Sequence, residues 1–522
     1  MPNATLAIIA LAGVLAASQS LSSEVVKLSS PGGGVEVSGR LLGYDGETYR
    51  IDTVYGVLTV SADGTDCVGA ACPDPGPYVA ELMVSGAAGT NTGVVPALLE
   101  AFAVERGLAF MRQEEDATHF LYVLSAAEGG GDIARVRFRV TESAEGFADL
   151  LTEAANIALA FSEPTAAERD RALEAGLGDL WEDRRSGVLA LDALVSIVAP
   201  GNPLGEISQP DLARVLRGEV LSWAALGGPD EPIALHLPTT GSALSERISD
   251  SLLGGAAVPG EGANRHQDLS DLDSAVEADP LALGVTSFSS SSLSKRLGIS
   301  GSCGAVIAPE PFTIKTKDYP LTVPQLAFTT DLTAPRFLGE FLAYTRSSLA
   351  QEAIRAAGFV DLAIDSRPLA RQGDRLVRAI LGTGSDVTAP DLRAMIRALD
   401  GAVQTSLTFR FKDGSADLDV QSRKSVTLLS EAILKGEFDS GDLIFAGFSD
   451  SQGSGETNRD LSLRRAEAVI AALRTELGEA PEPLFDAMSF GFGEALPIAC
   501  DDDAWGRETN RRVEVWFRRA QP

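Results

Sequence analysis

The sequence predicts a multidomain α/β protein: a small N-terminal β unit, a long two-lobed α/β region and a C-terminal α+β domain. Its 522 residues are too many for one hydrophobic core and indicate roughly three or four domains. Short alternating runs fill residues 24–76, whereas strand-like and helical runs alternate over residues 78–365. Residues 366–402 are expected to form a helical linker. From residue 403 the order becomes strand, helix, strand, helix, strand.

Composition and charge argue against several classes of function. Hydrophobic residues make up 45% and charged residues 22% of the chain, as in ordinary folded proteins. The formal net charge is −30 at pH 7 with no Lys/Arg cluster, so neither nucleic acid nor an anionic membrane surface is an expected partner. Histidine is limited to His119, His236 and His266, and no Ser/His/Asp, Cys/His or metal-ligand spacing is present. We therefore expect no enzyme, no cofactor and no metal site.

The N-terminus has the pattern of a secretory signal peptide, which we assign to residues 1–22. The apolar run Leu6–Ala17 has 12 residues, too few to cross a bilayer but suited to the hydrophobic part of a signal peptide. Small residues follow, and cleavage is expected near Ser18–Ser22. No Lys or Arg precedes Leu6, so an uncleaved anchor and a misassigned start are the alternatives. The pattern predicts export.

Residues 24–76 predict a small antiparallel β domain, because short alternating runs are separated by Gly and Asp turns. The Pro-rich segment Pro73–Pro77 closes this unit as a linker. Cys67 and Cys72 lie five positions apart in a Gly-containing loop, and a local disulfide is expected in an oxidising compartment. Cys303 and Cys500 lie in different predicted domains, so each is expected to be a lone thiol rather than half of a pair.

Residues 78–365 alternate between strands and helices. Leu82–Ser85 precedes the helical run Pro96–Phe102, and Ile157–Ala160 follows the helical run Phe147–Ala155. This order predicts a largely parallel sheet with helices on both faces, and its length predicts two lobes. In the linker that follows, the arginines are expected to be solvated: Arg375, Arg378, Arg393 and Arg397.

Segments of this region resemble, in order, the phosphate-binding substrate-binding proteins of ABC transporters. They are Ser85–Thr92, Glu142–Gly146, Ala160–Pro164, Asp192–Val198, Asp318–Thr322 and Ala357–Val360. The resemblance implies a two-lobed type II periplasmic binding protein fold that holds phosphate or a related small oxyanion, and it makes an ABC permease a candidate partner. Such sites use helix N-termini and hydroxyls. The candidates here are Thr90, Asn91, Thr92, Ser143, Ser162, Glu163, Thr240 and Ser242.

The second-lobe loop departs from that family. Relatives carry an arginine followed by Gly-Ser-Gly-Thr, whereas this chain reads Pro238-Thr239-Thr240-Gly241-Ser242-Ala243-Leu244. Loss of the arginine removes charge-assisted hydrogen bonds worth ~1.5–3 kcal/mol each. The alternative function is therefore a structural adaptor whose binding fold no longer takes phosphate. Glu163 lies where a carboxylate would accept the proton of HPO₄²⁻, and a solvated surface role is its alternative.

Residues 447–468 carry the most specific motif. A strand ending in Gly447-Phe448-Ser449-Asp450 leads through a Gly-containing loop to Asn458 and then to Leu461–Ala466, which opens a helix. Together with the segments Phe409–Leu418 and Asn510–Val515, this motif resembles the OmpA-like peptidoglycan-binding domain, expected over residues 403–522. The resemblance implies an α+β sandwich and a periplasmic protein attached to the cell wall and associated with the outer membrane.

The resemblance also implies a ligand, the diaminopimelate stem peptide of peptidoglycan. The free end of diaminopimelate carries an ammonium and a carboxylate on one carbon. Asp450 would accept from the ammonium, Arg465 would grip the carboxylate with its planar fork, and Asn458 would support them. The alternative is purely structural: Asp450 and Arg465 form only an ion pair between the loop and the helix. For Arg512, buried structural pairing and ligand contact are equally open.

Overall fold

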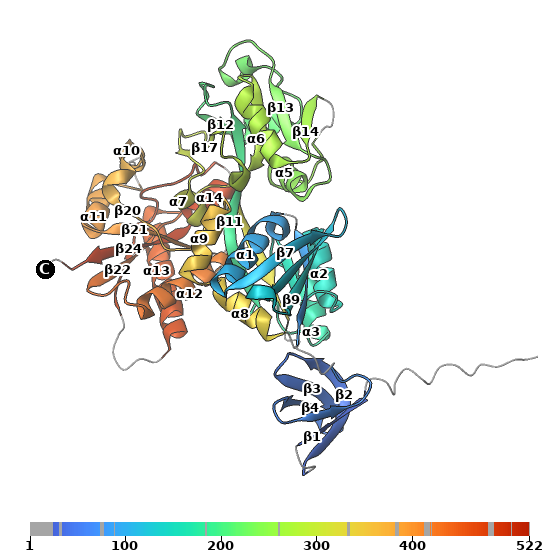
Figure 1. Cartoon of the computed structure of the whole chain (residues 1–522). Helices are drawn as coiled ribbons and strands as arrows, with labels where there is room; N and C mark the ends of the chain where they lie inside the picture. Colours follow the sequence, from blue (N-terminus) through green and yellow to red (C-terminus); the bar gives the residue numbers. More distant parts are fainter. Residues whose placement is uncertain are drawn as a thin grey trace, which may run out of the picture.

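The computed structural model describes residues 25–30, 34–73, 78–87, 89–182, 185–258, 262–330, 335–381, 386–411, 418, 420–478, 485–502 and 504–520. The N-terminal β unit lies at one end of the molecule against the first lobe, and the second lobe lies at the other end (Figure 1). The C-terminal domain lies beside the two lobes. The expected signal peptide, residues 1–22, is outside the described residues. Within them, no helix is long and apolar enough to cross a membrane.

The N-terminal unit is a five-stranded antiparallel sheet in the order β4-β3-β2-β1-β5. Its strands are β1 (Val25–Ser29), β2 (Glu36–Tyr44), β3 (Thr48–Thr53), β4 (Gly56–Ser61) and β5 (Asp66–Val68). Successive strand side chains point to opposite faces, so Val26, Leu28 and Ile51 meet on one side as a core. Cys67 and Cys72 form a disulfide. The ring of Tyr44 packs 5.3 Å from that of Tyr78, which ties the unit to the first lobe.

The first lobe packs helices on a mixed sheet. Its strands are β6 (Ala80–Ala87), β7 (Leu108–Glu114), β8 (His119–Ala126), β9 (Asp132–Thr141) and β10 (Ile157–Ala160); its helices are α1 (Val95–Glu105), α2 (Ser143–Leu151), α3 (Ala166–Glu174), α8 (Arg336–Tyr344) and α9 (Ser348–Ala356). β6 pairs in parallel with β9 and β10, but β7, β8 and β9 pair antiparallel. The expectation of a largely parallel sheet was wrong here, because no α-helix separates β7, β8 and β9.

Strand β11 (Ser186–Val198) joins the two lobes. Its first part pairs with β19 (Thr322–Phe328) and its last part with β15 (Ala282–Ser287). Residues 188–198 of β11 are buried throughout, which explains their nearly continuous apolar sequence. The second lobe adds β12 (Glu206–Ser208), β13 (Ala234–Pro238), β14 (Ala263–His266), β16 (Lys295–Arg296), β17 (Gly298–Ser300), β18 (Val306–Ile307), α4 (Gln209–Leu216), α5 (Ala243–Leu253), α6 (Leu269–Ala278) and α7 (Pro311–Lys315).

The C-terminal domain is a sheet in the order β20-β21-β24-β22-β23, covered by helices on both faces. Its elements are β20 (Ser366–Pro368), α10 (Gly373–Leu381), α11 (Ala389–Leu399), β21 (Val403–Arg410), α12 (Val420–Leu434), β22 (Gly441–Gly447), α13 (Gly455–Leu477), β23 (Asp486–Gly491), α14 (Ala504–Asn510) and β24 (Arg512–Arg519). Phe409 and Phe445 face α12 and α13, whereas Phe448 and Trp516 face α10 and α11.

The segment expected as a solvated linker is part of this domain. β20 pairs with β21, and Met395 and Leu399 of α11 enter the core of the second sheet face. Arg375, expected in solvent, is only 7% exposed and forms an ion pair with Glu514. Arg393 and Arg397 are exposed. The sequence did not predict this packing, because these helices pack against strands that lie later in the chain.

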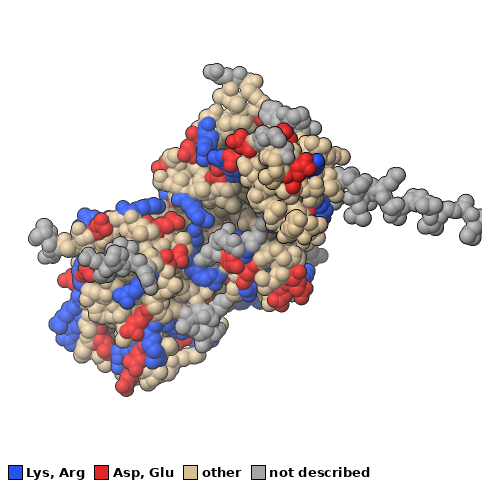
Figure 2. All heavy atoms as spheres, turned by 90° about the horizontal axis from the view of Figure 1, so that it is seen from below, with Lys and Arg blue, Asp and Glu red and all other residues tan. Residues whose placement is uncertain are grey.

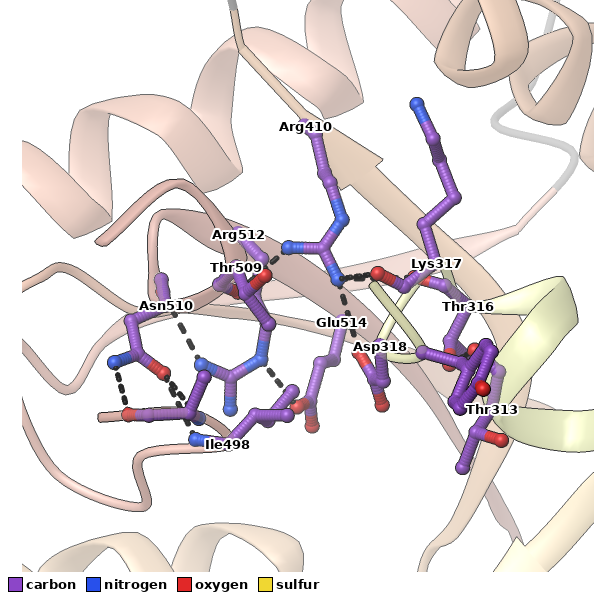
Figure 3. Close-up of polar contacts among 12 residues, drawn as sticks. Thr313, Thr316, Lys317, Asp318, Arg410, Ile498, Thr509, Asn510, Arg512 and Glu514 are labelled. Atoms are coloured by element: carbon purple, nitrogen blue, oxygen red, sulfur yellow. Dashed lines mark hydrogen bonds and ion pairs between the residues drawn. The ribbon is translucent and has the colours of Figure 1, made fainter. Parts of the chain in front are cut away.

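The C-terminal domain is fastened to the binding region by a buried polar contact. Figure 3 shows Arg410, the last residue of β21, reaching the loop after α7. One guanidinium nitrogen donates to Asp318 at 2.9 Å and to the carbonyl oxygens of Thr316 and Lys317. The other terminal nitrogen donates to the carbonyl of Thr509 at 2.6 Å within its own domain. Arg410 and Asp318 are each 4% or less exposed at the side chain, so the contact is part of an interior.

A disulfide also joins the C-terminal domain to the second lobe. Cys303 and Cys500 are bonded, with their Cα atoms 5.6 Å apart, although 197 positions separate them in sequence. The expectation of two lone thiols was therefore wrong. It assumed that separate domains do not touch, whereas Ile498 and Ala499 of the C-terminal domain enter the core of the second lobe and bring Cys500 to Cys303.

This disulfide gives a testable outcome for the oxidised protein. A single proteolytic cut anywhere between residues 304 and 499 should leave the two fragments joined on a non-reducing gel and separate on a reducing gel, because the bond closes a loop around the cut. Cys500→Ser should give separate fragments under both conditions. Fragments that separate without reductant from the unsubstituted chain would contradict the pairing.

Acidic and basic side chains are interspersed over the face drawn in Figure 2. Several basic residues of the first lobe serve local ion pairs: Arg135 lies 2.6 Å from Asp132, and Arg137 lies 2.9 Å from Glu115. On this face the cations therefore form no extended patch of the kind that polyanion binding requires.

Candidate functional sites

The first candidate site lies where β22 passes into α13. Gly447 ends the strand against the helix, and a Cβ there would collide with the carbonyl oxygen of Ser462. This close approach, which only glycine allows, places Asp450 beside the first turns of α13. Asn458 is 2% exposed and donates to the carbonyl of Asp450 at 3.3 Å and to the carboxylate of Glu494 at 2.7 Å. The amide of Asn458 therefore holds the loop in place.

Arg465 is a buried cation at this site. Its side chain lies on the third turn of α13 and is only 6% exposed. Neither Nε nor Nη1 has a hydrogen-bond partner among the residues that the structure describes. Burial, with the charge of Arg511, lowers the pKa of Arg465, and Asp450 only partly offsets this. A buried, incompletely satisfied guanidinium is costly, and an arriving carboxylate would satisfy it.

Asp450 has a different partner from the one that the sequence suggested. Its carboxylate accepts from Arg511 at 2.8 Å and from the backbone N–H of Gln452 at 3.3 Å. The simple Asp450–Arg465 ion pair, which was the purely structural alternative, is not among the ion pairs of the described residues. Arg511 was missed by sequence reasoning, although it stands in the same Asn-Arg-Arg motif.

Arg512 does not belong to the candidate site. It is 0% exposed, and its Nε donates to Glu514 at 2.8 Å while Nη2 donates to the carbonyl of Leu496 at 2.9 Å. Burial lowers the pKa of Arg512 to about 10. Of the two open interpretations, the structure has the buried pairing. Arg511, in the bend before β24, and Arg512, the first residue of β24, lie in different environments: the Arg511 side chain is 17% exposed and pairs with Asp450, whereas Arg512 is fully buried beside Glu514.

The cluster of charged residues around Asp450 is bipolar. Arg465 and Arg511 supply positive charge on one side. On the other, burial raises the pKa of Glu494, and the carboxylates of Asp501 and Asp450 contribute to the increase. Asp501 is held by the backbone N–H of Ser451 at 2.7 Å and by Asn510. A site with acids and bases side by side suits a ligand that carries both charges on one carbon.

The second candidate site is a cavity of about 410 Å³ between the two lobes. The loop before α1, the end of β10, the middle of β11 and the start of α5 all contribute to its lining. Of the predicted oxyanion residues, Thr92 and Ser242 line it. Ser242 also caps α5, accepting from the N–H of Ser245 at 3.2 Å. The cavity therefore has one helix N-terminus prepared for an anion.

The other predicted oxyanion residues lie elsewhere or are not described. The cavity lining does not include Ser143, Ser162, Glu163 or Thr240. Ser143 accepts instead from the backbone N–H of Phe161 at 3.2 Å. Ser162 and Thr240 are exposed. The side chains of Thr90 and Asn91 are outside the described residues, so their roles stay predictions.

Sequence reasoning missed the three charged residues of the cavity lining, Arg247, Asp192 and Asp268. Arg247 lies in the second turn of α5, five positions after its cap, and its Nε has no partner among the described residues. Asp192 stands in β11 and accepts from Ser289 Oγ at 2.7 Å and from the N–H groups of Ala193 and Ser289. The sequence held a weak signal for two of them: Arg247 follows the Ser242 cap of a helix, and Asp192 is an isolated charge in an apolar strand.

Asp192 predicts a pH dependence of stability. Burial raises its pKa to about 6 from an ordinary value of 3.8, in spite of the three hydrogen bonds. The folded state thus binds a proton that the unfolded state releases, so Asp192 stabilises the fold below pH 4 and this contribution is lost as the pH rises through 6. The melting temperature should rise from pH 7 to pH 5, and this rise should shrink in Asp192→Asn. An equal rise in both proteins would contradict the assignment.

The chain joins a two-lobed α/β region, with a cavity between its lobes, to a sandwich domain that carries a bipolar cluster of charged residues. Residues 102–334 match the PBP superfamily domain, and residues 410–511 match the OmpA family. The chain therefore contains a PBP superfamily domain and an OmpA family domain.

Curated relatives match one part of the chain or the other. The phosphate-binding protein PstS of Borreliella burgdorferi is 24% identical over 192 residues, which are 35% of this chain and 68% of that protein. PstS of Bacillus subtilis is 27% identical over 196 residues and is covered over 62% of its length. The outer-membrane lipoprotein YfiB of Pseudomonas aeruginosa is 35% identical over 98 residues, covering 19% of this chain and 55% of that protein. Among solved structures, an ABC-type phosphate transport receptor from Vibrio cholerae is 18% identical, with a TM-score of 0.40, over 53% of this chain and 99% of that one.

Proposed function

We propose that this protein is a periplasmic binding protein that attaches itself to peptidoglycan through its C-terminal domain and captures a small anion between its lobes. The observation that carries the proposal is the buried guanidinium of Arg465, 6% exposed and incompletely hydrogen-bonded, beside the carboxylate of Asp450. The match to the OmpA family and the likeness to an outer-membrane lipoprotein support a place in the cell envelope.

The bipolar cluster fits the free end of a diaminopimelate stem peptide. The ligand carboxylate would accept hydrogen bonds from the N–H groups of Arg465 that have no partner among the described residues. The ligand ammonium would lie toward the carboxylates of Asp450 and Glu494. Arg511 would hold Asp450 in position, because its guanidinium already donates to that carboxylate. Asn458 holds the loop that carries Asp450. These roles extend the predicted set by Arg511 and Glu494 and omit Arg512.

Sedimentation of the purified protein with sacculi tests wall binding. We expect co-sedimentation with sacculi that contain diaminopimelate and release by free meso-diaminopimelate at millimolar concentration. Nα-acetyl-L-lysine carries its ammonium and its carboxylate on different carbons, so it is the matched competitor that should release much less protein. Sedimentation that neither compound affects, or none at all, would contradict the proposed site.

The anion half of the proposal rests on the cavity between the lobes. The capped N-terminus of α5 and the guanidinium of Arg247 both face it, so it can hold a negative charge despite the net charge of the whole chain. Isothermal titration with inorganic phosphate and with organic anions tests this half. Heat of binding from any of these anions at micromolar to millimolar concentration supports it.

A structural adaptor is the second candidate function. Pro238 stands where phosphate-binding relatives carry arginine, and the C-terminal domain is fastened to the second lobe by a disulfide and a buried ion pair. This rigid attachment would serve a protein that positions partners on the wall. Wall binding without heat from any tested anion would favour the adaptor over anion capture.

A further inference from the structure

The first-lobe wall of the cavity is aromatic. Phe161, at the end of β10, and Phe359, after α9, both line the cavity. Each packs on a glycine of the segment before α1: a Cβ on Gly89 would come within 3.0 Å of the Phe161 ring, and one on Gly93 within 2.8 Å of the Phe359 ring. The glycines therefore make room for two rings on the same wall as the hydroxyl of Thr92. Ser162, the neighbour of Phe161, is exposed outside the cavity.

The second-lobe wall carries the positive charge. Arg247 is the one basic residue that lines the cavity as described, and Ser242 with the first turn of α5 lies beside it. Burial lowers the pKa of Arg247, and Asp250 only partly offsets this. Its Nε has no hydrogen-bond partner within the described part of the chain. The helix thus supplies, five positions after its cap, a cation in place of the arginine lost at position 238.

Apart from Arg247, the side-chain hydrogen-bond donors that line the cavity are neutral groups. Both oxygens of Asp192 already accept hydrogen bonds from Ser289, so this carboxylate belongs to the hinge rather than to a ligand. Ser287 and Gln325 add neutral polar groups. Asp268 adds a carboxylate on the second lobe, beside α6. An anion is therefore directed to one place, the Arg247 and Ser242 side of the cavity.

The volume of the cavity favours a ligand that is larger than a bare oxyanion. The cavity of about 410 Å³ lies in the range of ~300–1,000 Å³ that organic ligands occupy, whereas a water takes only ~30 Å³ of liquid volume. A tetrahedral oxyanion at Arg247 would leave the aromatic wall uncovered. An apolar body of the size of one ring would contact both rings and would remove from water the surface that the half-buried Phe161 leaves exposed; Phe359 is itself only 8% exposed.

We propose that the cavity takes an organic oxyanion, a phosphate monoester or a carboxylate that carries a ring-sized apolar body. The charged group lies on Arg247 and the N-terminus of α5, and the body lies against Phe161 and Phe359. This inference rests on the proposed capture of an anion and assigns its chemical class.

Titration of the full-length protein with phenyl phosphate, benzoate and inorganic phosphate tests the proposal. Phenyl phosphate should bind at least tenfold more tightly than inorganic phosphate, because the two share a charged group and differ in the ring. Benzoate decides whether a carboxylate serves as the charged group. Equal affinity for phenyl phosphate and inorganic phosphate would overturn this inference and leave anion capture standing. No binding of any of the three would overturn anion capture itself.

Two variants assign the residues. Arg247→Gln should weaken every anion that binds by at least tenfold, whereas Phe161→Leu should lower the ratio of the affinity for phenyl phosphate to the affinity for inorganic phosphate. Arg217→Gln, on the exposed end of α4, is the matched control and should change nothing. Unchanged affinities in Arg247→Gln would overturn the placement of the charged group. The comparison of the ligands on the unsubstituted protein decides the proposal even where a variant does not fold.

Discussion

Arg465→Ala should abolish the binding of the full-length protein to sacculi. The guanidinium is buried, and its unused N–H groups are the strongest donors available to a ligand carboxylate. Hydrogen bonds between charged groups are worth ~1.5–3 kcal/mol each, so two of them correspond to a loss of roughly 100-fold or more in affinity. The fraction that co-sediments, measured against the concentration of sacculi, gives the effect.

The neighbouring arginine is the matched control. Arg464 has the same charge on the same turn of α13 but is exposed, so Arg464→Ala should sediment like the unsubstituted protein. Arg465→Ala should also melt at the same temperature or higher, because it removes a buried cation that lacks full hydrogen bonding. Retained sedimentation of a folded Arg465→Ala protein would rule out the proposed clamp.

The second large effect is on stability, and it concerns Glu514. This carboxylate is 0% exposed and pairs with Arg512 at 2.8 Å and with Arg375. Glu514→Ala leaves two buried cations without their anion, and breaking such a pair costs ~3–5 kcal/mol. Thermal unfolding of the C-terminal domain, followed by circular dichroism, should show a much lower melting temperature. Glu508→Ala is the control, because Glu508 is partly exposed on the short helix α14.

The same carboxylate predicts acid sensitivity. Burial alone would raise its pKa, but Arg375 and Arg512 lower the pKa of Glu514 to about 2 from an ordinary value of 4.5. The folded state thus stays ionised where the unfolded state takes up a proton. The stability contribution is complete above pH 4.5 and is lost as the pH falls toward 2. A stability that does not change between pH 5 and pH 2.5 would contradict the paired state of Glu514.

Local patterns explain what could be predicted about the wall-binding site. Asp450, Asn458 and Arg465 lie on one strand end and the first turns of the helix that follows, so a short stretch of sequence contains most of the site. Which arginine of the Asn-Arg-Arg motif accompanies them depends on the direction of each side chain where the chain enters β24. Arg511 reaches Asp450 at 2.8 Å, whereas Arg512 is fully buried.

The ligand cavity was harder to predict for a physical reason. The order of strands and helices was enough to anticipate two lobes, but the lining depends on which side of each loop faces inward. Ser162 and Phe161 are adjacent, and the ring rather than the hydroxyl lines the cavity. Arg247 was missed because a charge on a helix surface has no sequence signal of its own; only the fold shows that the first lobe faces it across the cavity.

The sequence by itself determined the class of this protein: a β unit, a two-lobed α/β binding fold and a sandwich domain with an Asp-Asn-Arg motif. Those features arise from local periodicity and short motifs, which the chain carries wherever it folds. Only the tertiary structure decided that Cys303 pairs with Cys500, that Arg410 reaches Asp318, and that residues 366–402 pack into the last domain. These contacts join residues distant in sequence, and they form only when separate hydrophobic faces pack against one another.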